Sequence, residues 1–284
     1  MVTNMECVSL DKIAPMNHIY RFYELDDYFK TVSEIGYKSI DLWTCGAHYL
    51  VDHCSYQETK PIKEKLKEYG LSVICITPEQ TCPKPYNMAS KNPELIKRTR
   101  AYFQNVILAA SELECSKVLI TSGWQFFSEP RENAWKRSVE MVGQLCKFAE
   151  KYGVYLTMET LSPQSTTLVN TIHDMKRMVD EVNSNMLTIT IDLDTITNAG
   201  ESIQQYFDTF GKRVNHCHYM DHKKGFPGHL AWGDGESIPG ADFKEFNKNG
   251  YEGHFTLEYT MSTYFKEPAK VYKNTWDLLK NYIY

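Results

Sequence analysis

Four ionisable side chains fall near the C-terminal ends of short runs rich in β-branched residues: Glu159, Asp192, His218 and Glu258. A single glutamate in such a place is often only a solvated charge. Three carboxylates at close range, however, repel one another strongly unless a cation or protons neutralise them. Oxygen-dominated ligation with one histidine suits Mn²⁺, Mg²⁺ or Co²⁺, whereas Zn²⁺ usually prefers more nitrogen or sulfur. We therefore expect one divalent metal ion, with Mn²⁺ favoured.

The motif NHCHYMD at 215–221 contains two histidines one residue apart. Because side chains alternate with period two along a strand, His216 and His218 are expected to point to the same side. His216 lies one layer deeper than His218. This depth favours a core or supporting histidine over a direct metal ligand.

The elements that must position these residues are eight short β-branched runs, each followed by a helical pattern. We expect strands at 5–10, 39–43, 72–77, 117–122, 154–160, 187–194, 214–220 and 254–260. We expect helices at 24–35, 57–70, 92–114, 131–152, 171–183, 201–211, 241–249 and 267–282. Eight such βα units in 284 residues favour an α/β fold, a closed (β/α)8 TIM barrel, with residues 1–284 as a single domain.

In such a barrel the active site lies at the C-terminal ends of the strands. The longest irregular stretches, 44–56, 78–91, 123–130 and 221–240, all follow a strand and precede a helix, so we expect them to border the site. GDGES at 233–237 has the glycine spacing of a phosphate-binding turn. A lone G-x-G is a poor signal, and no Arg or Lys cluster stands beside it, which favours an unphosphorylated substrate.

Composition excludes several classes of protein. The 31 Lys and Arg residues against 36 Asp and Glu leave a formal charge of -5, so a nucleic-acid partner is not expected. No run approaches the roughly 18 apolar residues of a membrane helix, and the N-terminus lacks a basic start followed by an apolar run. We expect a cytoplasmic protein with reduced cysteines. No G-x-G-x-x-G turn follows the first expected strand, which disfavours a dinucleotide-binding fold.

A family resemblance covers nearly the whole chain. The segments that carry it are IDLWTCGAH, TPEQTCPKPYNM, METLSP, HCHYMD, GDGESIPG and GYEGHFTLEY. With these segments the chain resembles the sugar phosphate isomerase/epimerase family with xylose isomerase-like TIM barrels. Within that family it is similar to the ketose 3-epimerases, and among them to the fructoselysine 3-epimerases.

The resemblance implies a metal-dependent isomerase, an epimerase acting on a small sugar. The family's metal-binding positions fall on Glu159, Asp192, His218 and Glu258, and the two glutamates are implied to be the catalytic acid/base pair. Epimerisation next to a carbonyl removes a proton from one face and returns one to the other, which a single base does poorly. A metal ion stabilises the enediolate between these steps. The resemblance therefore implies C3 epimerisation of a ketose or a ketosamine of the fructoselysine type.

Four further residues are candidates for contacts with the sugar: His48, Tyr86, Trp124 and His229. The histidines would either hold sugar hydroxyls or lie on the surface. The aromatic residues would either form an apolar wall or pack loops. Tagatose 3-epimerases carry a histidine where this chain has Thr195 and a glutamate where it has Ser165, so free tagatose and psicose are disfavoured.

Three other functions compete with epimerisation. A lyase or dehydratase on the same barrel, for example one that cleaves a C-glycoside of a 3-keto sugar with a partner subunit, needs the same metal and base. Endonuclease IV is disfavoured because Thr195 and Pro227 stand where it has a ligand histidine and a ligand aspartate. A sugar-binding protein without turnover would not need both glutamates. Relatives commonly form dimers or tetramers, and a homo-oligomer is compatible with the sequence.

Overall fold

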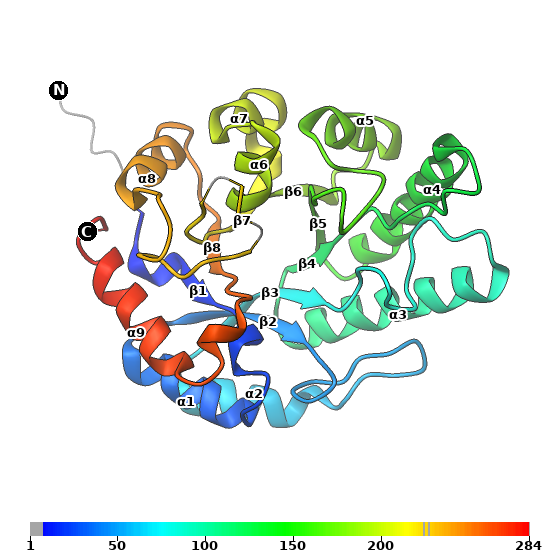
Figure 1. Cartoon of the computed structure of the whole chain (residues 1–284). Helices are drawn as coiled ribbons and strands as arrows, with labels where there is room; N and C mark the ends of the chain where they lie inside the picture. The colour runs from blue at the N-terminus through cyan, green and yellow to red at the C-terminus, as the bar shows by residue number, and fades with distance from the viewer. Residues whose placement is uncertain (1–7, 224, 227, 284) are drawn as a thin grey trace. The chain divides into compact units, whose positions relative to one another are not determined.

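The computed structural model describes residues 8–223, 225–226 and 228–283; Pro227, mentioned above, lies outside them (Figure 1). Its strands are β1 (Ile13–Pro15), β2 (Ser39–Thr44), β3 (Ser72–Pro78), β4 (Lys117–Ile120), β5 (Tyr155–Glu159), β6 (Leu187–Asp192), β7 (Val214–His218) and β8 (His254–Leu257). Seven of the eight predicted strands are confirmed.

All eight strands belong to one sheet in the order β1-β8-β7-β6-β5-β4-β3-β2. Neighbouring strands such as β7 with β8 and β4 with β5 pair in parallel. The two ends of this order meet at a parallel bridge between Met16, directly after β1, and Asp41 of β2. Strands that alternate with helices and close in this order have the topology of a (β/α)8 barrel.

The prediction of a first strand at 5–10 is wrong for its described part. Residues 5–7 lie outside the described residues, and 8–10 are not in a strand. Leu10–Lys12 form a short 3₁₀ helix, η1, in which the Ser9 hydroxyl accepts a hydrogen bond from the Asp11 amide. β1 follows at Ile13–Pro15, where all three residues are buried. Three residues ending in proline carry almost no alternating pattern, so sequence periodicity does not reveal this strand.

The α-helices are α1 (Leu25–Ile35), α2 (Thr59–Tyr69), α3 (Pro93–Glu112), α4 (Arg131–Glu150), α5 (Ile172–Val182), α6 (Leu193–Ala199), α7 (Ile203–Phe210), α8 (Pro239–Lys248) and α9 (Pro268–Leu279). Their ends follow ordinary capping rules. Asn92, for example, caps α3 by accepting from the amides of Glu94 and Leu95. None of the helices among the described residues is long and apolar enough to span a membrane.

Helix α6 is not predicted from the sequence. The alternation of LTITIDLD suggested a strand through residue 194, but β6 ends at Asp192. The Asp192 carboxylate accepts a hydrogen bond from the amide of Thr195, three residues later, and so caps α6. An aspartate at this position stops a strand and begins a helix.

The chain divides into two compact units. One comprises the described residues up to Asp41, Glu64–Ser72 and those from Ile191 onward; the other comprises Leu42–Lys63 and Val73–Thr190. In the first unit α1 packs against α9, and in the second α4 packs against both α3 and α5 (Figure 1). The single-domain organisation of residues 1–284 stays a prediction.

Candidate metal centre

Three of the four predicted metal ligands gather in one unit, at the ends of consecutive strands. Asp192 ends β6, His218 ends β7 and Glu258 directly follows β8. Nδ1 of His218 lies 2.9 Å from Oε2 of Glu258 and 3.5 Å from Oδ2 of Asp192. The side chains of His218 and Asp192 are buried, and that of Glu258 is 16% exposed. The parallel sheet thus brings two carboxylates and one imidazole together out of bulk water.

The two oxygens of Asp192 have different roles. Oδ1 accepts a 2.7 Å hydrogen bond from the backbone amide of Thr195 in the first turn of α6. Oδ2 is the oxygen that faces His218. The helix cap therefore holds the carboxylate plane, and one oxygen stays directed at the other predicted ligands.

His229, predicted as a contact for the sugar, lies against the same two carboxylates. Its Nδ1 is 3.1 Å from Oε2 of Glu258, and its Nε2 is 3.7 Å from Oδ2 of Asp192. Burial alone would lower the pKa of this histidine, but the charges of Asp192 and Glu258 outweigh burial and raise the pKa to about 10. Its imidazolium therefore supplies positive charge between the carboxylates.

The pKa values of the two carboxyl groups are shifted in the opposite direction, below their usual values. Burial would raise the pKa of Asp192, yet the imidazoles of His229 and His218 bring this pKa below its usual value. Burial acts in the same way on Glu258, and the charges of His218 and His229 hold its pKa well below the usual range. Both groups are ionised at neutral pH, as metal ligands must be.

The donor set fits a divalent cation. Asp192, His218 and Glu258 each offer one ligand atom, and these atoms lie within 4.8 Å of one another. Carboxylate oxygens with one imidazole nitrogen are donors that Mn²⁺, Mg²⁺, Co²⁺ and, less commonly, Zn²⁺ accept in proteins. A cation here would take over the neutralising role that His229 plays in its absence.

Glu159, the fourth predicted ligand, is the last residue of β5 and is buried. It belongs to the other compact unit. β5 pairs with β6 in a parallel register that sets Glu159 opposite Thr190, two residues before Asp192. Strand pairing therefore places this glutamate at the end of β5, opposite Thr190 of β6.

Two residues near this centre were missed because the first strand was misplaced. The segment directly after β1 carries His18, whose Nδ1 donates to the Tyr259 carbonyl at 3.0 Å, next to Glu258 in the chain. Burial lowers the pKa of His18 to about 4, although Glu258 acts in the opposite direction. Arg21 donates to Nε2 of His18 and lies 4.8 Å from the ring centre of Phe265.

The loop from β7 to α8 is organised by Asp221. Its carboxylate accepts hydrogen bonds from the amides of Gly233, Gly235 and Ser237 at 2.8–3.0 Å. A Cβ at Gly235 would collide with this carboxylate, which explains the glycine. The amides of GDGES are therefore bound by an aspartate of the same chain, which supports the prediction of an unphosphorylated substrate.

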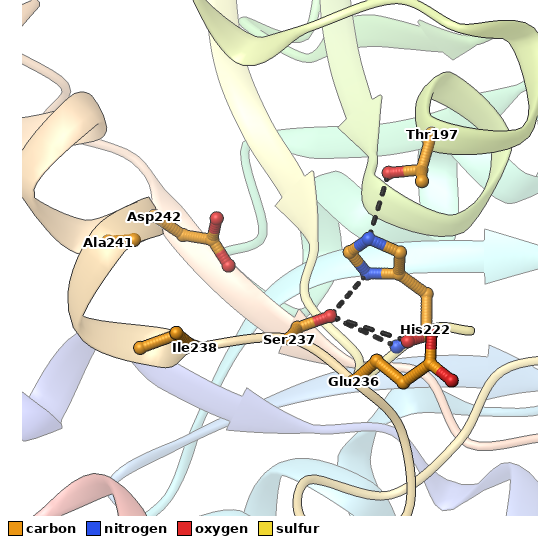
Figure 2. Close-up of a pocket in the computed structure, with 7 residues that line it drawn as sticks. All are labelled: Thr197, His222, Glu236, Ser237, Ile238, Ala241 and Asp242. Carbon is orange, nitrogen blue, oxygen red and sulfur yellow. Dashed lines mark hydrogen bonds between the residues drawn. The ribbon is translucent and has the colours of Figure 1, made fainter. Parts of the chain in front are cut away.

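Figure 2 shows how the base of this loop is attached to α6. The imidazole of His222 lies between the Thr197 hydroxyl, 3.0 Å from Nε2, and the Ser237 hydroxyl, 2.8 Å from Nδ1. These residues, with Ile238, Ala241, Asp242 and Glu236, line a cavity of about 330 Å³. Burial lowers the pKa of His222, so the ring is neutral and bonds to the two hydroxyls without an ion pair.

The other three predicted substrate contacts lie in the second unit. Asn87, in the loop after β3, bridges to the loop after β4: its Nδ2 donates to the Trp124 carbonyl at 2.8 Å, and its Oδ1 accepts from the Trp124 amide at 3.0 Å. Gly123 has a φ of +73°, and a Cβ there would collide with Asn87. Asn87 thereby joins the loops that carry Tyr86 and Trp124.

The rings of these candidates differ in exposure. Tyr86 stacks on Tyr102 at 3.7 Å with an interplanar angle of 6°, so one of its faces is used for packing. Trp124 is half-buried, and His48 is buried. The alternative that aromatic residues pack loops therefore holds for one face of Tyr86.

Comparison with known proteins agrees with this geometry. The model of the family described as xylose isomerase-like TIM barrel matches residues 29–282. The chain belongs to this family. Both the predicted fold class and the predicted family are thereby confirmed.

Two of the similar proteins are epimerases by name. Fructoselysine 3-epimerase of Shigella flexneri is 27% identical over 244 residues, which cover 86% of this chain and 88% of that protein. The solved structure of 3-keto-D-glucoside 4-epimerase from E. coli has a TM-score of 0.78 at 16% identity, covering 95% of this chain and 99% of that one. The IOLI protein, solved with a bound zinc atom, has a TM-score of 0.76 at 17% identity, covering 96% and 99%. The two structures show the shared fold.

Proposed function

We propose that this protein is a metal-dependent sugar epimerase that acts at C3 of a ketose or of a ketosamine such as fructoselysine. The observation that carries the proposal is the buried group of Asp192, His218 and Glu258 at consecutive strand ends. The similarity of the chain to fructoselysine 3-epimerase, over 86% of its length, supports the substrate class. Glu159 is the fourth ligand in this proposal, on the basis of the family resemblance, which sets a metal-binding position on it.

The chemistry assigns a role to each residue. A bound divalent cation would lower the energy of negative charge that develops on the sugar oxygens. Glu159 and Glu258 serve as the acid/base pair, one for each face of the sugar, and so move the proton off C3 and back. Asp192 and His218 would hold the cation, and the α6 cap keeps Asp192 in place. The low pKa of Glu258 keeps it ionised, at some cost in basicity.

Substrate contacts are proposed for His48, Tyr86, Trp124 and His229. The exposed part of Trp124 and the face of Tyr86 opposite Tyr102 would cover an apolar face of the sugar or its amine-linked group. His229 would contact a sugar hydroxyl once a metal ion neutralises Asp192 and Glu258. Manganese as the metal, a cytoplasmic location and a homo-oligomeric state are proposals from the sequence.

Cleavage of a C-glycoside, or dehydration, is the alternative outcome. Both begin with removal of a proton next to a carbonyl, so the same residues would serve. The two outcomes differ in the leaving group that the pocket orients. Product analysis with 3-ketoglycosides and with fructosamines separates them, since epimerisation changes only stereochemistry.

The proposal is tested by hydrogen exchange in heavy water. The protein with Mn²⁺ is mixed with a panel of ketoses and fructosamines, and deuterium at C3 is followed by NMR. We expect exchange at one carbon of one substrate class, and its loss in Glu159→Gln and in Glu258→Gln. Ser138→Ala, a buried substitution in α4, is the control and should exchange normally. Normal exchange in either glutamine variant would contradict the two-base assignment.

A further inference from the structure

A second buried polar group lies beside the proposed metal ligands, inside the same compact unit. Its members are Asp41 of β2, His216 of β7 and Thr256 of β8, and each is fully buried. Nε2 of His216 is 3.3 Å from Oδ2 of Asp41 and 3.2 Å from the Thr256 hydroxyl, which itself donates to Oδ2 at 2.9 Å. The three side chains thus form a closed triangle of polar contacts.

This triangle adjoins the ligand His218. The rings of His216 and His218 lie 5.5 Å apart at 81°, an edge-to-face contact. Asp41, His216 and His218 each offer one possible ligand atom, and these atoms lie within 4.8 Å of one another. His218 therefore contacts Asp192 and Glu258 through Nδ1 and has the Asp41–His216 pair as a further neighbour.

A buried carboxylate is costly to desolvate and is retained only where its partners compensate. Asp41 and His216 compensate each other, but two apolar side chains of similar volume would fill the same space at less cost. A role in orienting the imidazole of His218 would account for the presence of this polar pair. Imidazoles that bind a metal are commonly held by a carboxylate or another polar group behind the ring, and loss of that group weakens metal binding.

We propose that Asp41 and His216 are positioning residues for the cation site. They hold the imidazole of His218 in the orientation that directs Nδ1 at Asp192 and Glu258, with Thr256 fixing both partners. The inference rests on the proposed function, since it assumes that His218 binds a metal ion. A pair that only stabilises the core would change unfolding without changing metal affinity, and this difference makes the idea testable.

The experiment measures Mn²⁺ and Co²⁺ affinity of the full chain by titration calorimetry, with the Co²⁺ visible absorption spectrum as a second readout. Asp41→Asn keeps the shape and can still accept from Thr256, but it loses the charge. We expect it to bind Mn²⁺ about 10- to 100-fold more weakly and to shift the Co²⁺ spectrum. Thr256→Val, which removes the hydroxyl shared by Asp41 and His216, should change both readouts in the same direction.

Ser138→Ala is the matched control, because the Ser138 hydroxyl is also fully buried and donates to the Ser122 carbonyl at 2.7 Å. It should lower stability and leave affinity unchanged. Wild-type affinity and spectrum in a folded Asp41→Asn or Thr256→Val would overturn the inference while leaving the proposed function intact. Absence of Mn²⁺ binding by the wild-type chain would instead overturn the proposed function.

Discussion

His229→Gln should destabilise the metal-free protein much more than the metal-bound protein. In the absence of a cation, the imidazolium of His229 is 3.1 Å from Glu258 and 3.7 Å from Asp192. Glutamine approximates its size but carries no charge. The substitution therefore leaves two neighbouring carboxylates with His218 as their remaining close imidazole.

The magnitude follows from these distances. At an effective dielectric of about 20, each ion pair contributes roughly 4–5 kcal/mol before desolvation is subtracted. Removing one partner of a buried pair costs about 3–5 kcal/mol, and the 19% exposure of His229 puts its loss near the lower value, about 3 kcal/mol. For a chain of this size, that is about 6 °C in melting temperature. Saturating Mn²⁺ would neutralise the carboxylates, and the loss should fall below about 1 kcal/mol.

The assay compares melting temperatures of wild type and His229→Gln, each after chelation and with excess Mn²⁺. Ser138→Ala is the control, because the buried Ser138 hydroxyl donates to the Ser122 carbonyl and carries no charge. It should be equally destabilising with and without metal. An equal loss for His229→Gln in both conditions, or none after chelation, would refute the view that His229 and the cation alternate as counter-charge.

Three further predictions concern metal removal, pH and the loops. Chelation of the bound metal should abolish C3 exchange and lower the melting temperature, and Mn²⁺ should restore both; exchange that survives chelation would contradict metal dependence. Burial, with the charges of Glu245 and Asp221, raises the pKa of Asp242 to about 7, so the folded state favours its protonated form. The stability that this preference gives the folded state is complete below about pH 4 and is lost as pH rises towards 7. Asp242→Asn should therefore be about 1–2 kcal/mol more stable than wild type at pH 8 in urea unfolding, and should show no such gain at pH 4. Asn87→Ala removes three hydrogen bonds, two with Trp124 and one with Ala89, and should cost about 2–4 kcal/mol in urea unfolding; a loss below 0.5 kcal/mol would show that Asn87 does not hold these loops.

The positions of the proposed ligands were predictable because they depend on local pattern and topology. Parallel strands with β-branched residues are recognisable from sequence, and a (β/α)8 order brings their C-terminal ends to one edge. One ionisable residue per strand end was therefore enough to place Asp192 beside His218 and Glu258. Roles for Glu159 and for the sugar contacts stay predictions.

The partners of those ligands were not predictable in the same way. His229 lies eleven residues beyond His218 in an irregular loop, and its approach to Glu258 depends on how Asp221 folds that loop. Asp41 reaches His216 and Thr256 only through closure of the sheet, across 175 and 215 residues of chain. His18 was hidden because a three-residue strand ending in proline has no periodicity to detect.

The unpredicted helix α6 connects Asp192, a proposed ligand, to the loop that carries His229. Asp192 caps the helix through Thr195, and Thr197, two residues further, bonds to His222. His222 bonds to Ser237, whose amide donates to the Asp221 carboxylate that also binds Gly233 and Gly235. Asp221 in turn exchanges backbone hydrogen bonds with Leu230, the residue after His229. Hydrogen bonds joined by short stretches of backbone therefore lead from the Asp192 carboxylate to the histidine that balances its charge. Because every link is local to α6 or to the β7–α8 loop, a substitution such as Thr197→Val should move His229 without disturbing β6.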